Sequence, residues 1–493
     1  MSENHNIETS PTLQVPVHRL PTELLSEIFI LYQDIHCAEG EDEFRESIDQ
    51  GSTLTTGTLG SVCSRWRSIS LDTPHLWSRF SLDIASSCHK TDLIHYRSRV
   101  LERLSRSKQL PLSFAVYCGD DEMDDPERQL ECQSILGLLV EQAHRWYYVF
   151  WNLWRATQEF RALLDVNRDL PLLKTIKLQG SVHFDSLIGM FNQASCLRKL
   201  VLVEIELNRL NSRMDHLSHL HISGLVNGKG VVSSIKELAD CFPALQTLDL
   251  EYQEAPINVL ESGVKEIHFG KLENLRLKYI TWYETVTIFS LLTLPSLRKI
   301  SLVEIDNEWF HVEEFHSCDS IFASFISRSK CPLSTLELAC LQEFPGMHII
   351  GVMLKSMPSL TGLTMHESWS QSYNSHFTEF FMKTLCVPNT SALGDGSEKG
   401  QLSDVSQSQS SEPILPNLQS LDLLVDTNRP EFDQFVLVDM IKSRCTPDSR
   451  ADNVQWSCLR NVKVAVDNRE SQTGLELLQR LQLLKDAGIP IEI

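Results

Sequence analysis

The amino-acid sequence predicts an α/β solenoid, in which short strands alternate with helices along most of the chain. A proline-containing pattern, apolar-Pro-x-Leu-x-x-apolar-x-apolar, recurs in LPLLKTIKL (170–178), FPALQTLDL (242–250), LPSLRKISL (294–302), MPSLTGLTM (357–365) and LPNLQSLDL (415–423). Further segments keep the leucines without the proline, so the first anchor recurs as Leu173, Leu197, Leu217, Leu245, Leu272, Leu297, Leu333, Leu360, Leu418 and Leu459. Most successive anchors lie 20 to 28 residues apart. Repetition at such spacings indicates a stacked-repeat architecture.

Each repeat predicts one strand and one helix. Side chains alternate faces along the final x-Leu-x-Leu residues, so both anchors point into the core. Proline before the strand ends any preceding helix. The segment between two strands, such as SSIKELADCF (233–242), carries its apolar residues at helical spacing. One strand and one helix cannot bury these faces alone, so neighbouring repeats must stack.

Three aromatic-rich segments extend this reading toward the N-terminus. LWSRFSL (76–82), LPLSFAV (110–116) and WYYVFW (146–151) predict further strands over a large aromatic core. The repeats resemble the leucine-rich-repeat superfamily, most clearly over residues 170–466. This resemblance implies an irregular horseshoe with a parallel sheet on its concave side. The chain departs from the family in one respect. Three residues after the last anchor the family has Asn or Cys, whereas five repeats of this chain have Ser181, Ile205, Gln253, Ile280 and Ile305.

Two short amphipathic helices are predicted before the repeats. The first spans about 21–35, with Leu24, Leu25, Ile28, Phe29 and Tyr32 on one face. The second spans 59–70, with Leu59, Val62, Cys63, Trp66 and Ile69 on one stripe, and the connection 36–57 is predicted to be a loop. Two such helices are too small to fold alone, so their apolar surface must pack against something else.

The motifs in these helices resemble the F-box. LPTELLSEIF (20–29) and VCSRW (62–66) match its two blocks, and DTPHLW (72–77) is similar to the usual sequel in fungal F-box proteins. The resemblance implies binding to the Skp-type adaptor of a cullin–RING ubiquitin ligase, through Leu20, Pro21, Leu24, Leu25, Ile28, Phe29, Val62, Cys63 and Trp66. The loop 36–57 is longer than in a minimal F-box. The alternative is that these helices only cap the N-terminal end of the solenoid.

These predictions give a domain organisation for the 493 residues. Residues 1–15 are predicted to be a disordered N-terminus, and residues 16–72 an F-box-like helical unit. Residues 73–493 are predicted to form the solenoid. Within it, the polar segment 389–412 contains almost no large apolar residue and is predicted to be a disordered insertion.

The composition excludes several classes of partner. The formal net charge is −21, which repels nucleic-acid phosphate and anionic membranes. No apolar run reaches the length of a membrane span. The 13 cysteines are scattered and form no CxxC motif. This usage is typical of reduced thiols, so we expect a cytoplasmic or nuclear protein.

No catalytic motif stands out in the sequence, and we predict a non-enzymatic chain without a cofactor. GLVNGKG (224–230) lacks the spacing of a phosphate-binding loop. His219 and His221 would point the same way from one strand, as metal ligands do. No cysteine or carboxylate is placed to complete such a site, so ordinary surface positions explain them better.

The outward strand positions predict a substrate-binding face. The early strands place Lys177, Lys199, His219, His221, Arg276 and Lys299 there, against a single acidic residue in those six strands. A basic face on an acidic chain would bind an acidic or phosphorylated protein segment. The alternative is an ordinary solvated sheet surface. Taken together, the sequence predicts a substrate-recognition subunit of an SCF-type ubiquitin ligase. A leucine-rich-repeat scaffold without a ligase is the alternative.

Overall fold

The computed structural model of the chain describes residues 16–37, 56–84, 90–117, 126–152, 169–180, 191, 194–204, 213–225, 231–252, 266–280, 282–303, 318–339, 353–366, 379–387, 414–427, 432–445 and 456–493. The chain divides into two units, Met1–Leu197 (unit 1) and Arg198–Ile493 (unit 2). The segments 1–15 and 389–412, which the sequence predicts to be disordered, lie outside the described residues. Most of the predicted loop 36–57 does so as well.

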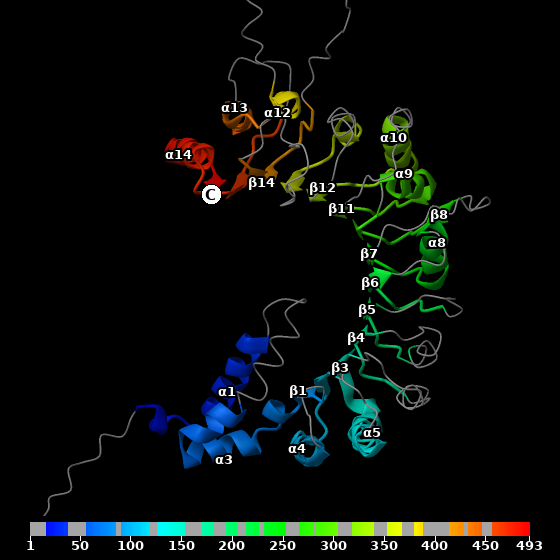
Figure 1. Cartoon of the computed structure of the whole chain (residues 1–493), viewed down its shortest axis with the longest axis vertical. Helices are drawn as coiled ribbons and strands as arrows, with labels where there is room; N and C mark the ends of the chain where they lie inside the picture. Colours follow the sequence, from blue (N-terminus) through cyan, green and yellow to red (C-terminus); the bar gives the residue numbers. More distant parts are fainter. Residues whose placement is uncertain are drawn as a thin grey trace, which may run out of the picture. The chain divides into compact units, whose positions relative to one another are not determined.

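Unit 1 starts with helices and continues into parallel strands. Its helices and short 3₁₀ turns are η1 (Pro16–Arg19), α1 (Thr22–Cys37), a helical segment at 56–62, α3 (Ser64–Asp72), η2 (Pro74–Trp77), α4 (Lys90–Arg106), α5 (Pro126–Glu141) and η3 (Ala143–Arg145). Its strands are β1 (Arg79–Asp83), β2 (Leu112–Tyr117), β3 (Trp146–Asn152) and β4 (Thr175–Gln179). These strands pair in chain order, each parallel to the next (Figure 1).

The aromatic segments of unit 1 form strands, as the sequence predicts. Phe80, Phe114, Trp146 and Trp151 come from β1, β2 and β3 and are almost completely buried. Phe80 stacks on Phe114 with 5.7 Å between ring centroids, and Trp146 meets both Phe114 and Trp151 edge to face. The indole N–H of Trp146 donates to the carbonyl oxygen of Leu139 at 2.9 Å. These rings therefore fill the core between the sheet and its helices.

Unit 2 repeats the same alternation of strands and helices. The strands of its larger sheet are β5 (Lys199–Val203), β6 (His219–Leu225), β7 (Thr247–Tyr252), β9 (Asn274–Lys278), β11 (Lys299–Val303), β12 (Thr335–Ala339), β13 (Gly362–His366), β14 (Ser420–Asp426), β15 (Asn461–Asp467) and β16 (Ile491–Glu492). A two-stranded sheet pairs β8 (Ile267–His268) with β10 (Leu292–Thr293). The helices are α8 (Val231–Cys241), α9 (Trp282–Leu291), α10 (Cys318–Ser329), α12 (Glu379–Leu385), α13 (Gln434–Cys445) and α14 (Gln472–Asp486). Figure 1 shows α8, α9 and α10 on one side of the strands β6 to β11.

Parallel pairing without offset explains why the leucine pattern recurs. The residue pairs Leu200–Leu220, Leu220–Leu248 and Leu248–Leu275 stand directly opposite one another on neighbouring strands. This places one apolar row across the sheet, facing the helices. All ten first-anchor leucines, from Leu173 to Leu459, are at most 3% exposed. The predicted α/β class with a parallel sheet is confirmed, and the repeating order within each unit is compatible with a solenoid.

The chain leaves several strands through a residue in the left-handed region. Glu204 and Tyr279 follow β5 and β9 with φ near +55°, and Gly180 follows β4. Gly224, near the end of β6, has φ +72°, and a Cβ atom there would lie 2.6 Å from Cγ of Glu204. Only glycine meets both conditions without strain.

Three arginines satisfy carbonyl groups at the ends of turns and helices. Arg145 donates to the carbonyl oxygen of Leu110 at 3.0 Å, and Arg328 donates to that of Phe289 at 2.8 Å. Arg444 is fully buried at the end of α13 and donates to three carbonyl oxygens, those of Leu385, Ile414 and Leu415. Long-range bonds of this kind tie successive repeats together.

Candidate functional site

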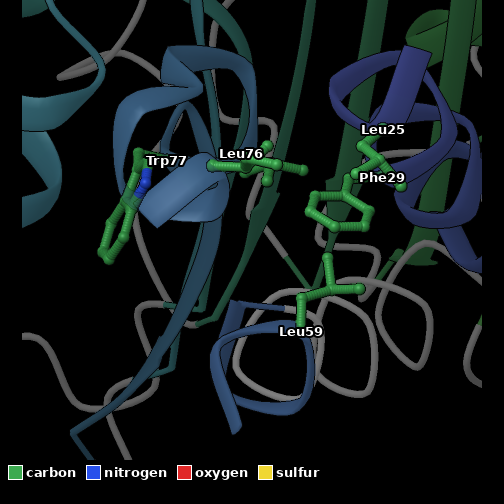
Figure 2. Close-up of a cluster of buried hydrophobic side chains, with 6 residues drawn as sticks. Leu25, Phe29, Leu59, Leu76 and Trp77 are labelled. Carbon is green, nitrogen blue, oxygen red and sulfur yellow. The ribbon is translucent and has the colours of Figure 1, made fainter. Parts of the chain in front are cut away.

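The N-terminal helices share a small hydrophobic core with the start of the repeats. This N-terminal core consists of Leu25, Phe29, Leu59, Ile69, Leu76 and Trp77, each at most 9% exposed. Figure 2 shows Phe29 of α1 pointing between Leu59 and Leu76. Trp66 packs on the edge of this core, with its ring 4.9 Å from that of Phe29. Part of the apolar surface of the two helices is therefore buried by residues of this same chain.

The predicted helix 59–70 is interrupted, which corrects the sequence analysis. Cys63 has extended backbone angles, φ −161° and ψ 169°, and separates the helical segment 56–62 from α3. Its sulfur accepts a hydrogen bond from the backbone N–H of Trp66 at 3.5 Å, so Cys63 serves as the N-cap of α3. The break removes the single apolar stripe that the spacing predicts. Leu59 and Ile69 face the core, whereas Val62 is 56% exposed.

Polar contacts hold α1 in place at both ends. Near its start, Arg65 of α3 donates to the carbonyl oxygen of Leu20 at 2.5 Å. Near its end, Asp34 forms an ion pair with Arg79 of β1. These contacts leave α1 little freedom to rotate about its axis, so the residues on its outer face are fixed in direction.

The outer face of α1 is apolar and exposed. It carries Leu24, Ile28, Leu31 and Tyr32, which are 52%, 46%, 57% and 41% exposed. Their spacing of i, i+4, i+7 and i+8 places them along one side of the helix. We call these four residues the α1 apolar face. Large apolar side chains grouped on one face, in contrast to scattered ones, indicate an interaction surface.

The structure divides the predicted adaptor-binding residues into two groups. Leu24, Ile28 and Val62 are exposed, and Pro21 is exposed as well. Leu20, Cys63 and Trp66 are half-buried. Leu25 and Phe29 are each 1% exposed and belong to the N-terminal core, so contacts within this chain account for them. Sequence reasoning missed Leu31, although its position three residues after Ile28 would have placed it on the outer face.

Three of the six predicted basic residues, His221, Arg276 and Lys299, have acidic partners within the sheet. The Nδ1 atom of His221 lies 2.8 Å from Oδ2 of Asp249, and a guanidinium nitrogen of Arg276 lies 3.9 Å from the same oxygen. Lys299 is 2.8 Å from Oε2 of Glu337 on the neighbouring strand. Lys278, which the sequence analysis does not single out, lies 3.1 Å from Glu251 in a fourth pair. Across β7 to β12, three acidic residues thus balance three basic ones.

The remaining members of that predicted set lie elsewhere. Lys177 is in unit 1, where its ammonium group lies 5.3 Å from the ring centre of Phe150. Lys199 begins β5. Nδ1 of His219 lies 2.8 Å from the hydroxyl oxygen of Ser218. Register places Lys199 opposite His219 across β5 and β6.

The ion pair with Lys299 changes the titration of Glu337. Burial alone would raise the pKa of Glu337, but the hydrogen bond and charge of Lys299, the hydroxyl of Ser301 and the charge of Arg276 outweigh it. The pKa of Glu337 therefore lies below its ordinary value. Lys299 and Arg276 already interact with acidic side chains within the sheet. This weakens the expectation that they form a basic surface for a substrate.

Within the described ranges, no cluster of three or more His, Cys, Asp or Glu side chains could hold a metal ion. No helix in the part of the chain that the structure describes is long and apolar enough to cross a bilayer. The α1 apolar face groups four exposed apolar side chains on one helix, the feature that indicates an interaction surface.

No model of a known protein family matches the chain, and no curated protein matches it.

Proposed function

We propose that this chain is the substrate-recognition subunit of an SCF-type cullin–RING ubiquitin ligase. In this proposal the N-terminal helices form an F-box that binds a Skp-type adaptor, and the repeats bind the protein to be ubiquitinated. The single observation that carries the proposal is the α1 apolar face, which lies within the segment LPTELLSEIF and its continuation. The order of the F-box motifs along the chain supports the same conclusion.

The exposed apolar surface of the α1 apolar face and Val62 is large enough to contribute to binding. Leu24, Ile28, Leu31, Tyr32 and Val62 each keep about half of their side-chain surface in water. Complete burial of one such side chain is worth roughly 1.5–3 kcal/mol, so burying the exposed half of all five is worth roughly 4–7 kcal/mol. Association costs offset part of this gain. A helical partner with a complementary apolar groove would supply the remainder through its own buried surface.

An acidic or phosphorylated substrate is not part of this proposal. Arg276 and Lys299 already face Asp249 and Glu337, so the sheet of unit 2 offers no dense group of unpaired cations over β7 to β12. The class of substrate is left to experiment.

Co-purification with the adaptor tests the proposal. The chain would be expressed together with a Skp-type adaptor and cullin, and the bound fraction measured with wild-type chain and with Leu24→Asp plus Ile28→Asp. Both side chains are about half exposed, so the double substitution should leave the N-terminal core folded. The expected result is capture by the wild type and at least a 100-fold loss of affinity in the variant.

A matched control uses exposed leucines at the other end of the chain. Leu475 and Leu483 of α14 are 50% and 67% exposed, and Leu475→Asp plus Leu483→Asp should leave adaptor binding unchanged. If a folded wild-type chain binds no adaptor, the ligase proposal is wrong and a scaffold without a ligase becomes the better reading. Equal loss in both double variants would show that the effect is not specific to α1.

A further inference from the structure

Two cysteines lie next to each other where α13 ends and the entry to β15 begins. Cys445 is the last residue of α13, and Cys458 lies three residues before the first residue of β15. The backbone N–H of Leu459 donates to the carbonyl oxygen of Arg444 at 3.1 Å. This bond joins the two peptide units to which the cysteines belong.

Because both peptide bonds are trans, the Cα atoms of Cys445 and Cys458 both lie close to the hydrogen bond between Leu459 and Arg444. The Cα atom of Cys445 is on the same side of its peptide unit as the accepting oxygen of Arg444. The Cα atom of Cys458 is on the same side of its peptide unit as the donated hydrogen of Leu459. Two such atoms lie within a few ångströms of each other, in the range that a disulfide spans, roughly 4.4–6.8 Å.

The residue before Cys458 is also fixed by a backbone hydrogen bond. The backbone N–H of Ser457 donates to the carbonyl oxygen of Pro416 at 2.7 Å. Cys458 therefore stands between two backbone hydrogen bonds, and Cys445 follows the buried Arg444. Both thiols belong to free cysteines and are half-buried, so a small oxidant can reach them.

The charge of Cys458 acts on the titration of Cys445. Burial raises the pKa of Cys445, and the nearby charge of Cys458 raises it further, to about 11. Such a charge effect falls steeply with distance, which agrees with the backbone contact.

From the backbone contact we propose that Cys445 and Cys458 form a disulfide when the protein meets a peroxide-type oxidant. The thiolate of Cys458 attacks hydrogen peroxide; an S–O bond forms, the O–O bond breaks, and hydroxide leaves and is protonated to water. The sulfur of Cys445, after losing its proton to solvent, attacks the resulting sulfenic acid. The S–S bond forms, the S–O bond breaks, and a second water is released. The pair loses two electrons, which the peroxide takes up.

The bridge would close the connection 446–457 between α13 and β15. It would fix the same junction that Arg444 holds through its carbonyl contacts, and so restrict opening of the last repeats. The inference rests on unit 2 alone and does not depend on adaptor binding.

Peptide mapping of the oxidised full-length chain tests the proposal. The purified, reduced protein would be treated with a small excess of hydrogen peroxide at pH 8.5, where the Cys445 thiol loses its proton more readily. Remaining thiols would then be blocked and the protein cut with trypsin without reduction. Cleavage after Arg444, Arg450 and Arg460 gives two peptides, 445–450 and 451–460, with one cysteine each. The expected result is a linked pair lighter than the sum of the two peptides by two hydrogens, which reduction separates.

Variants and a denatured control keep the test specific. Cys458→Ser should abolish the linked pair, whereas Cys331→Ser should leave it unchanged. In the unfolded protein the linked pair should be a several-fold smaller share of all disulfides. The proposal is overturned if Cys445 links chiefly to another cysteine, or if the folded and unfolded chains give the same share of the pair. It is also overturned if both peptides carry only blocked or over-oxidised sulfur.

Discussion

The buried guanidinium of Arg444 offers the sharpest test of how the repeats are held together. Its side chain is 0% exposed, and its Nε and Nη1 atoms donate to the carbonyl oxygens of Leu385 at 2.6 Å and Leu415 at 3.0 Å. A third bond reaches the carbonyl oxygen of Ile414. Burial lowers the pKa of Arg444 to about 10, with the Cys386 thiolate acting in the opposite direction, so the group is still charged at pH 7.

The substitution Arg444→Met removes these three charge-assisted bonds and leaves the carbonyl oxygens without their donor. Each such bond is worth about 1.5–3 kcal/mol, and relief from burying a charge offsets part of the loss. We expect unfolding of this region to become easier by about 3–5 kcal/mol. Arg444→Lys should lose part of the same stability, because one ammonium group cannot donate to three separated carbonyl oxygens as the planar guanidinium does.

Hydrogen exchange measures this locally, without assuming that both units unfold together. Backbone amides of α13 and the amide of Leu459 should exchange at least about 100-fold faster in Arg444→Met, since each 1.4 kcal/mol is a factor of ten. Arg469→Met is the matched control, because Arg469 is exposed. Acceleration below tenfold, or equal acceleration in the control, would refute the assignment of Arg444 as the support of this junction.

Four further substitutions test the N-terminal unit and the sheet. Phe29→Ala should destabilise the N-terminal core by about 3–4 kcal/mol, measured by urea denaturation followed by tryptophan fluorescence, whereas Leu24→Ala should cost below about 1 kcal/mol. Cys63→Ser should raise the melting temperature by about 1–4 °C, because a hydroxyl oxygen is a stronger N-cap acceptor than sulfur. Lys299→Met should lower the denaturation midpoint at pH 7. Since the folded pKa of Glu337 lies below its unfolded value, the stability due to the pair is present above the unfolded pKa of about 4.5. It is lost as the pH falls through the lowered folded pKa, so the difference from wild type should shrink as the pH falls below about 4.5.

Each of these expectations has a contrary outcome. Equal losses in Phe29→Ala and Leu24→Ala would mean that the two faces of α1 are not distinct. A lower melting temperature in Cys63→Ser would show that the site needs the larger sulfur for packing. A constant difference between pH 7 and pH 3 in Lys299→Met would mean that Glu337 does not depend on Lys299.

The strands were predictable because their signal is local. Every anchor leucine has its apolar partner two residues on, and this alternation needs no knowledge of neighbouring strands. The proline before the first anchor fixed the strand entry in segments such as 242–250 and 415–423, where the structure places β7 and β14. The aromatic strands β1 and β3 were found by the same alternation, although they share few residues with the other repeats.

The charges on the sheet were not predictable in the same way, because pairing depends on register between strands. From the sequence, Arg276 and Lys299 count as positive charges on a surface. Zero-offset pairing then sets Arg276 opposite Asp249, and Lys299 also reaches Glu337, which lies diagonally across on β12. Listing outward residues strand by strand therefore overestimates the free charge of a sheet.

The N-terminal helix was predicted with one apolar face, and the structure shows that it has two. Leu25 and Phe29 pack inward on the N-terminal core, while Leu24 and Ile28 point outward, one residue earlier in each case. A helix that only capped the repeats would need the inward residues and would gain by having polar ones outside. Capping therefore accounts for half of the apolar pattern in LPTELLSEIF. The outward half stays about half exposed, and the contact with another protein that we propose would bury it.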